Sequence, residues 1–369
     1  MEFSEYERIY DEAAHGAPRC GRIRQALDMA LEQADIENAL RLYYVFIEED
    51  TFYSDNFQSV ILFPEYLDLF EKYPQYHEQF SYYLMWAFKW ISSSAADFYQ
   101  ISLQQITDIY RQYGEYCDKL HYNKRSYYRK IWCLMNNHGI RNFMLCPDCE
   151  EAHRLMMHCP KDELSEVKAG EADDLTSYYL EVEKDIHKAL KAAEPILSGA
   201  YTCNVVPHYT YVNLAVYYFE HHQPEQADSY AKKGLRIINR DFGSDSSMVL
   251  YKGNIIMILS YTDLPTALKF FRRQLPVCYT NECGFDMFFF YRGAYHLLRN
   301  LEKSGQKTVK LHFPWKDDPV FRPGNVYPVS RLKDYFYEKA KYLADRFDER
   351  NHNHHLHYLL QKNVSDAEG

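Results

Sequence analysis

The stretch that decides the fold reads YVNLAVYYFEHHQPEQADSYAKKGLRII and runs from Tyr211 to Ile238. In its first half, apolar and small residues recur at spacings of three, one and three, which places them on one face of a helix. Pro224 follows a short polar turn, at a position typical of the first residue of a helix. The second half carries a stripe of small residues, which allows two helix axes to approach closely. The stretch therefore predicts a helical hairpin, and the longer segment from Tyr209 to Gln274 predicts two in succession.

The start of the second helix recurs along the chain. Each copy has a polar residue, usually an Asp suited to capping a helix, four positions before an Ala. The copies begin at Asp35, Asp148, Asp185, Gln223 and Asp263. From Asp148 onward they lie 37, 38 and 40 residues apart. This spacing predicts stacked hairpins, each of which buries the apolar face of its neighbour.

The offsets within the first hairpin resemble those of a tetratricopeptide repeat (TPR). The matching positions are Tyr211, Leu214, Ala215, Tyr218, Ala227, Ala231 and Gly234. Asn239 stands where the repeat usually has a proline. The resemblance implies an all-α, right-handed, TPR-like solenoid of helical hairpins with a C-terminal capping helix. It also implies that the first helix of each hairpin lines a concave face.

A second resemblance, over Asp162 to Ile238, is to a group of mostly uncharacterised bacterial TPR proteins. That group carries a Pro-x-Leu-x-Gly-x-x-Thr-Cys element followed by a proline, and this chain has a similar element at Pro195 to Cys203, then Pro207. The segment Phe347 to Asn351 is similar to the C-terminus of that group. Where the group tends to carry a cysteine pair, this chain has Glu166 to Gly170. The resemblance implies a helical repeat fold and a bacterial cytosolic origin, and it implies no settled activity.

We expect one continuous solenoid in three parts. They are TPR-like helical repeats over residues 1–302, a proline-rich insertion loop over 303–329, and a capping helix with a polar tail over 330–369, frayed from Val364. No strand pattern is visible, and a soft domain boundary falls near Pro160 to Gly170. Ser92 to Ala95 is expected to connect two helices. Other helices are expected at Phe57–Lys72, Met144–Met157, Ile186–Leu197, Ser247–Gln274 (a hairpin) and Ser330–Arg350.

Composition narrows the class of partner. With 47% hydrophobic and 25% charged residues, the chain is globular. Its net charge of −10 argues against nucleic acid and anionic membranes as partners. The N-terminus does not resemble a signal peptide, and the longest aliphatic runs, such as Ile255 to Leu259, are too short to span a membrane. Nine cysteines without an export signal indicate reduced thiols, so we expect a cytoplasmic protein.

The expected concave face supplies the leading candidate site. Asn213 lies where TPR proteins often place an amide that grips a peptide backbone with its donor and its acceptor. The candidate residues for binding a protein or peptide are His208, Tyr211, Asn213, Tyr217, Tyr251, Lys252, Asn254 and Tyr291. The alternative is that Asn213 is a solvated polar residue and that most of the 35 tyrosines pack between helices.

A cysteine and histidine cluster supplies a candidate zinc site. Its ligands would be Cys146, Cys149, His153 and Cys159, because zinc prefers four nitrogen or sulfur ligands. The spacing matches no familiar zinc motif, and buried or incidental thiols are the alternative. Zinc is thus the one cofactor that the sequence leaves open.

No pattern nominates a catalytic residue. P-loop, dinucleotide, HExxH and Gly-x-Ser-x-Gly motifs are all missing from the sequence. Arg350 and Asn351, with His355, resemble the short Arg-x4-His signature of HEPN-type ribonucleases, although an acidic chain is a poor RNA binder.

The leading expectation is a non-catalytic scaffold that binds a protein or a peptide. One alternative is a cytosolic peptide-sensing regulator similar to the Rap group of TPR proteins. A toxin-neutralising immunity protein, whose acidic surface masks a basic toxin, suits the charge equally well. An enzyme with a metal or RNA site is the alternative of a different class.

Overall fold

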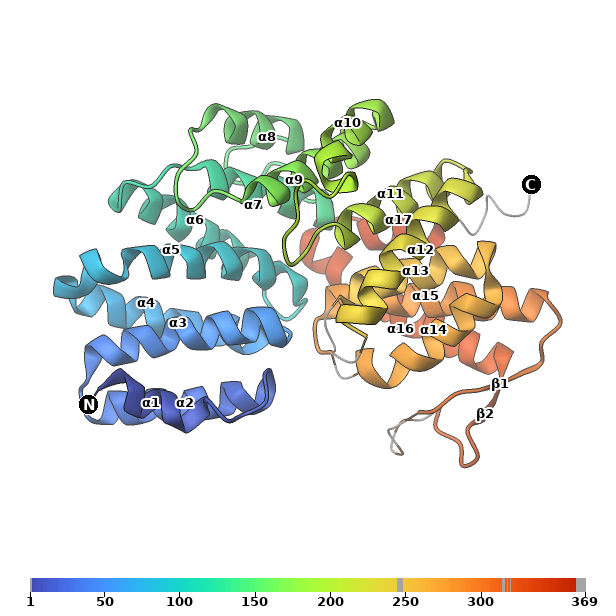
Figure 1. Cartoon of the computed structure of the whole chain (residues 1–369), viewed down its shortest axis with the longest axis horizontal. Coiled ribbons are helices and arrows are strands. Elements are labelled where there is room, and N and C mark those ends of the chain that lie inside the picture. The colour runs from blue at the N-terminus through green and yellow to red at the C-terminus, as the bar shows by residue number, and fades with distance from the viewer. Residues whose placement is uncertain are drawn as a thin grey trace. The chain divides into compact units, whose positions relative to one another are not determined.

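The computed structural model describes residues 2–243, 248–279, 281–313, 316, 318 and 320–362. Within these residues the chain is all-helical apart from two short strands (Figure 1). The contacts divide the chain into two compact units, Met1–Ser165 and Glu166–Gly369. Within each unit, nearly every helix packs against the next one along the chain. The expected hairpin start at Ser247, the loop prolines Pro314 and Pro319, and the tail from Val364 lie outside the described residues.

The first unit is a succession of antiparallel helices. Its α-helices are α1 (Phe3–Tyr10), α2 (Ala17–Glu32), α3 (Ile36–Tyr53), α4 (Phe57–Lys72), α5 (His77–Ser94), α6 (Leu103–Lys119), α7 (Arg125–His138) and α8 (Cys149–His158). Short 3-10 turns precede and follow α5, at Pro74–Tyr76 and Ala95–Asp97. Helix α5 packs against both α3 and α7, and this places the three in one layer.

The described part of the second unit contains four hairpins followed by a short terminal helix. Its helices are α9 (Lys168–Glu181), α10 (Ile186–Leu197), α11 (His208–Glu220), α12 (Pro224–Asp241), α13 (Val249–Thr262), α14 (Leu264–Cys278), α15 (Gly284–Lys303), α16 (Val329–Asn351) and α17 (His355–Gln361). The first helices of the hairpins, α9, α11, α13 and α15, pack on one another in chain order.

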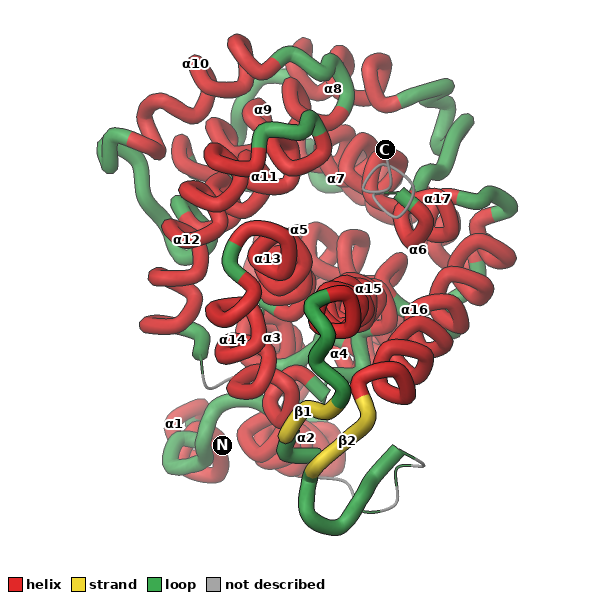
Figure 2. The backbone as a smooth tube through the Cα atoms, turned by 90° about the vertical axis from the view of Figure 1, so that its right-hand side faces the viewer, coloured by secondary structure: helices red, strands yellow, loops and turns green. Residues whose placement is uncertain are grey.

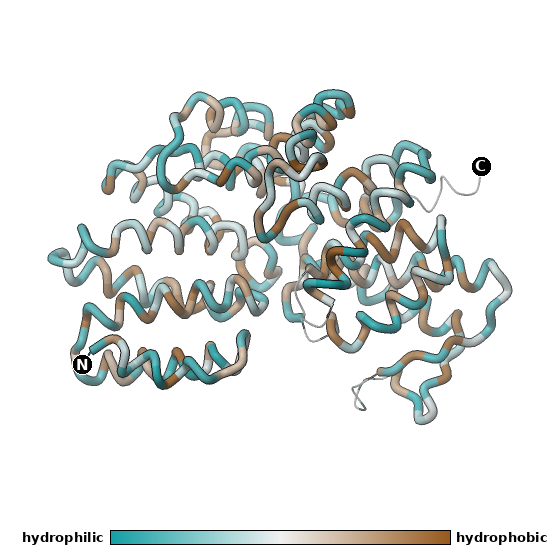
Figure 3. Tube along the Cα trace, in the orientation of Figure 1, coloured by the Kyte–Doolittle hydropathy of each residue, from teal (hydrophilic) through white to brown (hydrophobic). Residues whose placement is uncertain are grey.

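The local sequence accounts for several helix boundaries. Hydrophobic and hydrophilic residues alternate along most helices, as expected when one face is buried (Figure 3). Three of the recurring Asp residues act as N-caps: Asp148 accepts from Glu151 N at 2.9 Å, Asp185 from Lys188 N at 3.0 Å and Asp263 from Thr266 N at 3.3 Å. Asp35 makes no such bond at the start of α3. At the other end of a helix, Gly139 stops α7 in the left-handed conformation, with φ of 63°.

Two of the expected helix boundaries are wrong. Helix α8 starts at Cys149 rather than at Met144, because Met144 and Leu145 both have positive φ and form a turn instead. The expected connection at Ser92–Ala95 instead holds the last turn of α5 and the first residue of a 3-10 turn. There the serine hydroxyls donate to carbonyls one turn back, such as Lys89 O and Trp90 O, so the helix continues.

The segment between α15 and α16 contains strands that the sequence did not predict. Strands β1 (Thr308–Lys310) and β2 (Val326–Pro328) pair antiparallel, with Val309 opposite Tyr327 (Figure 2). Three-residue strands are too short to give an alternating pattern that stands out.

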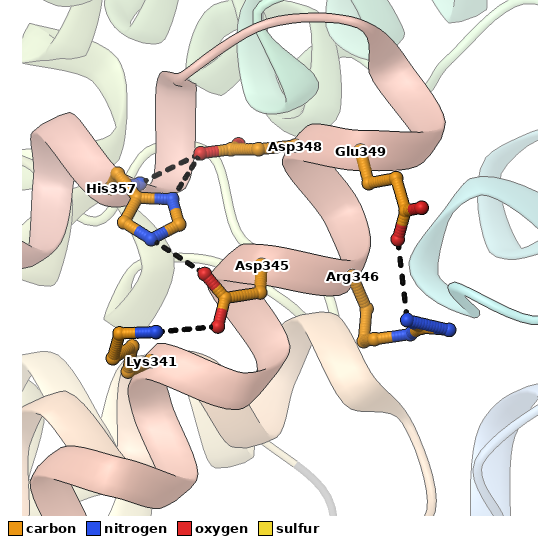
Figure 4. A network of polar contacts seen from close by, with 6 residues as sticks. All are labelled: Lys341, Asp345, Arg346, Asp348, Glu349 and His357. Atoms are coloured by element: carbon orange, nitrogen blue, oxygen red, sulfur yellow. Dashed lines mark hydrogen bonds and ion pairs between the residues drawn. The ribbon is translucent and has the colours of Figure 1, made fainter.

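The C-terminal helix pair is held by a cluster of charges (Figure 4). Asp348, near the end of α16, accepts hydrogen bonds from the backbone N–H groups of Leu356 and His357 at 2.9 and 3.0 Å, and so caps α17. The His357 ring lies between two carboxylates, 2.8 Å from Asp348 and 2.9 Å from Asp345. Lys341 adds an ion pair of 2.7 Å to Asp345. His357 of α17 therefore fastens this helix to α16.

Helices α13 and α15 meet backbone to backbone. Gly253 on α13 faces Gly293 on α15, and a Cβ atom on Gly293 would overlap the carbonyl oxygen of Gly253. A Cβ atom on Gly253 would overlap the carbonyl of Phe289 in the same way. The two helix axes can approach this closely only because neither residue has a side chain. In the described part of the chain, none of the helices combines the length and the apolar character needed to cross a membrane.

The glycine contact can be tested by adding one methyl group. Gly293→Ala should lower the free energy of unfolding by about 3 kcal/mol, because the methyl forces apart two backbones that cannot rearrange as a side chain can. Gly21→Ala is the matched control, since a Cβ atom at Gly21, on an exposed face of α2, meets nothing within 4 Å. It should raise stability by about 0.5–1 kcal/mol. Urea unfolding measures both, and equal effects of the two substitutions would contradict the close approach.

Candidate functional site

The layer formed by α9, α11, α13 and α15 carries all eight of the residues expected to bind a partner. Four of them are buried: His208, Tyr217, Lys252 and Asn254. The other four are partly exposed: Tyr211, Asn213, Tyr251 and Tyr291. Part of the surface of each of these four residues is therefore accessible to solvent.

A polar seam joins α9 to α11. Asn213 Nδ2 donates to Ser177 Oγ at 3.2 Å, and Thr210 Oγ1 donates to Asp173 at 2.5 Å. Further along, the Tyr217 hydroxyl donates to the Lys184 carbonyl at 3.4 Å. The amide donor of the half-buried Asn213 is thus used between helices.

Aromatic rings join the next helices along the layer. Tyr209 of α11 stacks on Tyr251 of α13 with ring centroids 3.9 Å apart. Tyr211 faces a different helix, where the Lys233 ammonium of α12 lies 5.7 Å from its ring. Tyr291 packs against Phe336 of α16, 5.9 Å away, rather than against these residues. Tyr251 therefore contacts α11, whereas Tyr291 contacts α16.

His208 is buried at the start of α11. Its ring packs against Phe242 at 5.0 Å, and burial lowers its pKa to about 4, with Asp241 opposing part of the shift. Within the described residues its Nε2 has no hydrogen-bond partner. A neutral histidine in this position contributes packing, and protonating it is unfavourable.

The four candidate zinc ligands lie in and beside α8. Burial raises the pKa of the Cys146 thiol and of the Cys159 thiol, which disfavours the thiolate that zinc requires. Cys149 directs its thiol toward the Trp132 carbonyl at 3.8 Å, and the His153 ring packs edge-on against the same Trp132. Among the described residues, no group of three or more His, Cys, Asp or Glu side chains is arranged to hold a metal ion.

The residues of the ribonuclease-like signature lie where α16 gives way to α17. Arg350 donates from Nε to Asn351 Oδ1 at 2.9 Å, and its guanidinium lies 4.9 Å from the centre of the Phe347 ring. The backbone N–H of His355 donates to Asn353 Oδ1 at 3.1 Å. Arg350 and His355 therefore take part in contacts at the junction between α16 and α17.

Sequence reasoning missed an exposed aromatic surface on α3 and α5. Its members, which we call the aromatic row, are Tyr44, Phe52, Tyr82, Tyr83, Trp86 and Trp90. Trp90 is its centre: ring centroids of Trp86 and Phe52 lie 5.5 Å away, and that of Tyr44 lies 5.7 Å away. Phe52 is 48% exposed, Tyr82 37% and Tyr83 40%. The signal in the sequence was the four-residue spacing of Tyr82, Trp86 and Trp90, which also fits a buried face.

The base of the aromatic row is fixed from beneath. The Lys89 ammonium lies 3.9 Å from the centre of the Trp86 ring and donates to the Leu164 carbonyl at 2.9 Å. At the edge, the Tyr44 hydroxyl donates to Glu48 at 3.4 Å, and burial raises the pKa of that carboxyl. A rigid set of ring faces beside a carboxylate is suited to apolar and cationic side chains.

Comparison of the sequence with models of known protein families and with curated proteins gives no match.

The buried histidine predicts how stability depends on pH. The pKa of His208 is lower in the folded than in the unfolded chain, so the unfolded state binds more protons between pH 6.5 and 4. Wild type should therefore lose stability as the pH falls through this range. His208→Phe keeps a ring and removes the titrating group. Between pH 7 and 4.5, its free energy of unfolding should therefore fall by about 2–3 kcal/mol less than that of wild type.

Urea unfolding at the two pH values measures this difference. His187→Phe, at an exposed position on α10, is the control and should follow wild type. Parallel loss of stability in wild type and His208→Phe would mean that His208 is accessible to protons in the folded state.

Proposed function

We propose that the chain is a non-catalytic scaffold that binds another protein, and that it works in the bacterial cytoplasm. We also propose that its hairpins form a right-handed, TPR-like solenoid. The succession of hairpins in the second unit supports this, as does the small-residue stripe of α12: Ala227 and Ala231 are buried, and Gly234 lies close to Val212 of α11. Repeats of this kind present an extended surface rather than a catalytic cleft.

The observation that carries the binding proposal is the exposure of the aromatic row. Large apolar side chains that remain exposed in one contiguous patch mark interaction sites. Trp and Tyr are also the residues that contribute most to binding energy in protein interfaces. Phe52, Tyr82 and Tyr83 keep more than a third of their surface open to solvent, and they lie beside Tyr44, Trp86 and Trp90, which are partly exposed.

The chemistry of the surface supports a basic segment of another protein as the partner. Lys and Arg side chains bind aromatic faces through cation–π contacts, and Glu48 offers them a carboxylate at the edge. A net charge of −10 also attracts a basic partner over distance. Both regulatory alternatives, the peptide sensor and the immunity protein, are versions of this function. The choice between them depends on which partner is captured.

The concave residues remain a second candidate surface for the same function. Tyr251 and Asn213 are two of its four partly exposed members, and each contacts a neighbouring helix. A rigid side chain of this kind loses little entropy on binding.

The two surfaces can be separated by mutation. The full-length chain is used to capture a partner from its native organism, and the purified partner is then titrated by calorimetry. Trp90→Ala should weaken binding by about 2 kcal/mol, or roughly 30-fold, because it removes the ring at the centre of the row. Tyr358→Ala, at a residue of α17 that is 59% exposed, is the matched control and should bind like wild type.

Tyr251→Ala is measured in the same series. If Tyr251→Ala loses binding and Trp90→Ala keeps wild-type affinity, the partner binds the second candidate surface, which includes Tyr251, and not the aromatic row. Melting curves of each variant show whether the fold is intact. Wild-type affinity in both variants would contradict the proposed sites, and turnover of RNA by the wild-type protein would contradict a non-catalytic scaffold.

A further inference from the structure

One face of α15 carries three buried basic residues. Arg292, His296 and Arg299 follow one another at intervals of four and three, so they lie on the same side of the helix. Arg292 is 3% exposed and His296 is fully buried. Burying a cation without a partner is strongly unfavourable, so nearby groups must compensate the charge of this face.

Among the described residues, the Tyr261 hydroxyl and the Glu220 carboxylate of neighbouring helices act on this face. Tyr261 of α13 lies 2.8 Å from His296 Nδ1 through its hydroxyl, which also bonds to the Arg299 side chain. Glu220 of α11 acts on Arg292 through its charge, but it is paired with Lys362 at 2.8 Å. The arginine is therefore influenced by a carboxylate that is already engaged elsewhere.

Two of the three basic residues present unused donors. In the described part of the chain, Arg292 Nε and Nη2 and His296 Nε2 are buried and have no hydrogen-bond partner. Burial and the nearby charges of Arg292 and Arg299 hold the pKa of His296 well below its usual range, so its ring is neutral. Because a guanidinium can only donate, Tyr261 accepts from Arg299 and gives its own proton to His296 Nδ1. The ring proton then lies on Nε2, which makes this atom a donor.

The unused edge of Arg292 is the edge that binds carboxylates elsewhere in this protein. Arg154 donates from Nε and Nη2 to the two oxygens of Glu151 at 2.7 and 2.6 Å. Arg240 donates from the same two atoms to Asp241 at 2.6 and 2.7 Å. This two-point geometry matches the spacing of carboxylate oxygens.

We propose that Arg292 and His296 bind the carboxylate group of a ligand, with the Nε–Nη2 edge of Arg292 holding its two oxygens and His296 Nε2 donating a further hydrogen bond. The site lies on α15 in the second unit and is independent of the aromatic row of the first unit. The carboxylate belongs either to a small free acid or to the C-terminus of a peptide, and the binding chemistry is the same for both.

The charge balance supports an anionic ligand. Burial lowers the pKa of Arg292 to about 10, so the guanidinium remains protonated at neutral pH. A bound carboxylate neutralises that charge and satisfies both donors of the edge. The enclosure of Arg292 and His296 favours a small group over a bulky one.

The test measures thermal stabilisation of the full-length chain by carboxylates. Acetate, glutarate, a short peptide with a free C-terminus, the same peptide with a C-terminal amide, and inorganic phosphate are titrated at constant ionic strength, with chloride as the reference. A saturable rise in Tm with carboxylates is expected, since a ligand that binds only the folded state stabilises it. Response to the free acids alone identifies a small ligand, whereas response to the free but not the amidated peptide identifies a peptide end.

Variants show whether the response comes from this site. Arg292→Lys keeps the charge and removes the two-point edge, so affinity should fall roughly tenfold or more. Arg292→Met removes the buried charge; it should fold at least as well as wild type in the absence of ligand and lose the response. Arg240→Lys, at an exposed arginine with the same bonding edge, is the matched control and should respond like wild type.

His296→Phe provides an independent readout if the Arg292 variants fail to fold. It keeps a ring in the core and removes the Nε2 donor, so it should bind several-fold more weakly. Three results would overturn the proposal: no saturable response to any carboxylate, a response to phosphate alone, or wild-type affinity in both Arg292→Lys and His296→Phe. Trp90→Ala should leave the carboxylate response unchanged, so loss of the protein partner and loss of this site are distinguishable.

Discussion

The direct contact between the backbones of α13 and α15 is the constraint on which the second unit depends. Gly253 and Gly293 face each other where any side chain would overlap a carbonyl group. The close approach brings the polar groups of the two helices within reach: Asn300 Nδ2 donates to the Ser260 carbonyl at 3.1 Å and to its hydroxyl at 3.0 Å. The Tyr261–His296 hydrogen bond crosses the same interface.

Such close packing of two helices also removes polar side chains from water, which is unfavourable. Helix α13 is buried along nearly its whole length, and it buries Lys252 and Asn254 together with its aliphatic residues. Buried polar groups are stabilised by hydrogen bonds to the protein or to ordered water. Asn300 and Ser260 bond each other across the interface, whereas Arg292 Nε and Nη2 have no hydrogen-bond partner within the described residues. The tight packing of α13 and α15 thus buries a guanidinium edge, that of Arg292, which suits an anionic ligand.

Periodicity and capping were enough to predict the helices but not their neighbours. The bounds expected for Phe57–Lys72 and Ile186–Leu197 agree with α4 and α10, because both helices have a clear apolar face and defined ends. A single sequence does not show which apolar faces meet, so the contact of Gly253 with Gly293 could not be predicted.

The candidate site shows the same limit of sequence reasoning. Periodicity identifies the face of a helix, but it does not show whether another layer covers that face. His208 and Lys252 were therefore expected on an open surface, and both are buried. Trp86 and Trp90 present the opposite case, since their spacing also fits a buried core and the structure leaves the surface around them partly exposed. The strands β1 and β2 are too short to leave any periodic signal.

The account describes a helical protein with two kinds of surface, a rigid aromatic row on α3 and α5 and a polar, tightly packed layer around α13 and α15. Its central claim is that the aromatic row receives a protein partner. Hydrogen exchange of the full-length chain, measured alone and saturated with its captured partner, tests this claim most directly. The account predicts that amide exchange slows in α3 and α5 when the partner binds. Slower exchange in other helices, with none in α3 and α5, would contradict it.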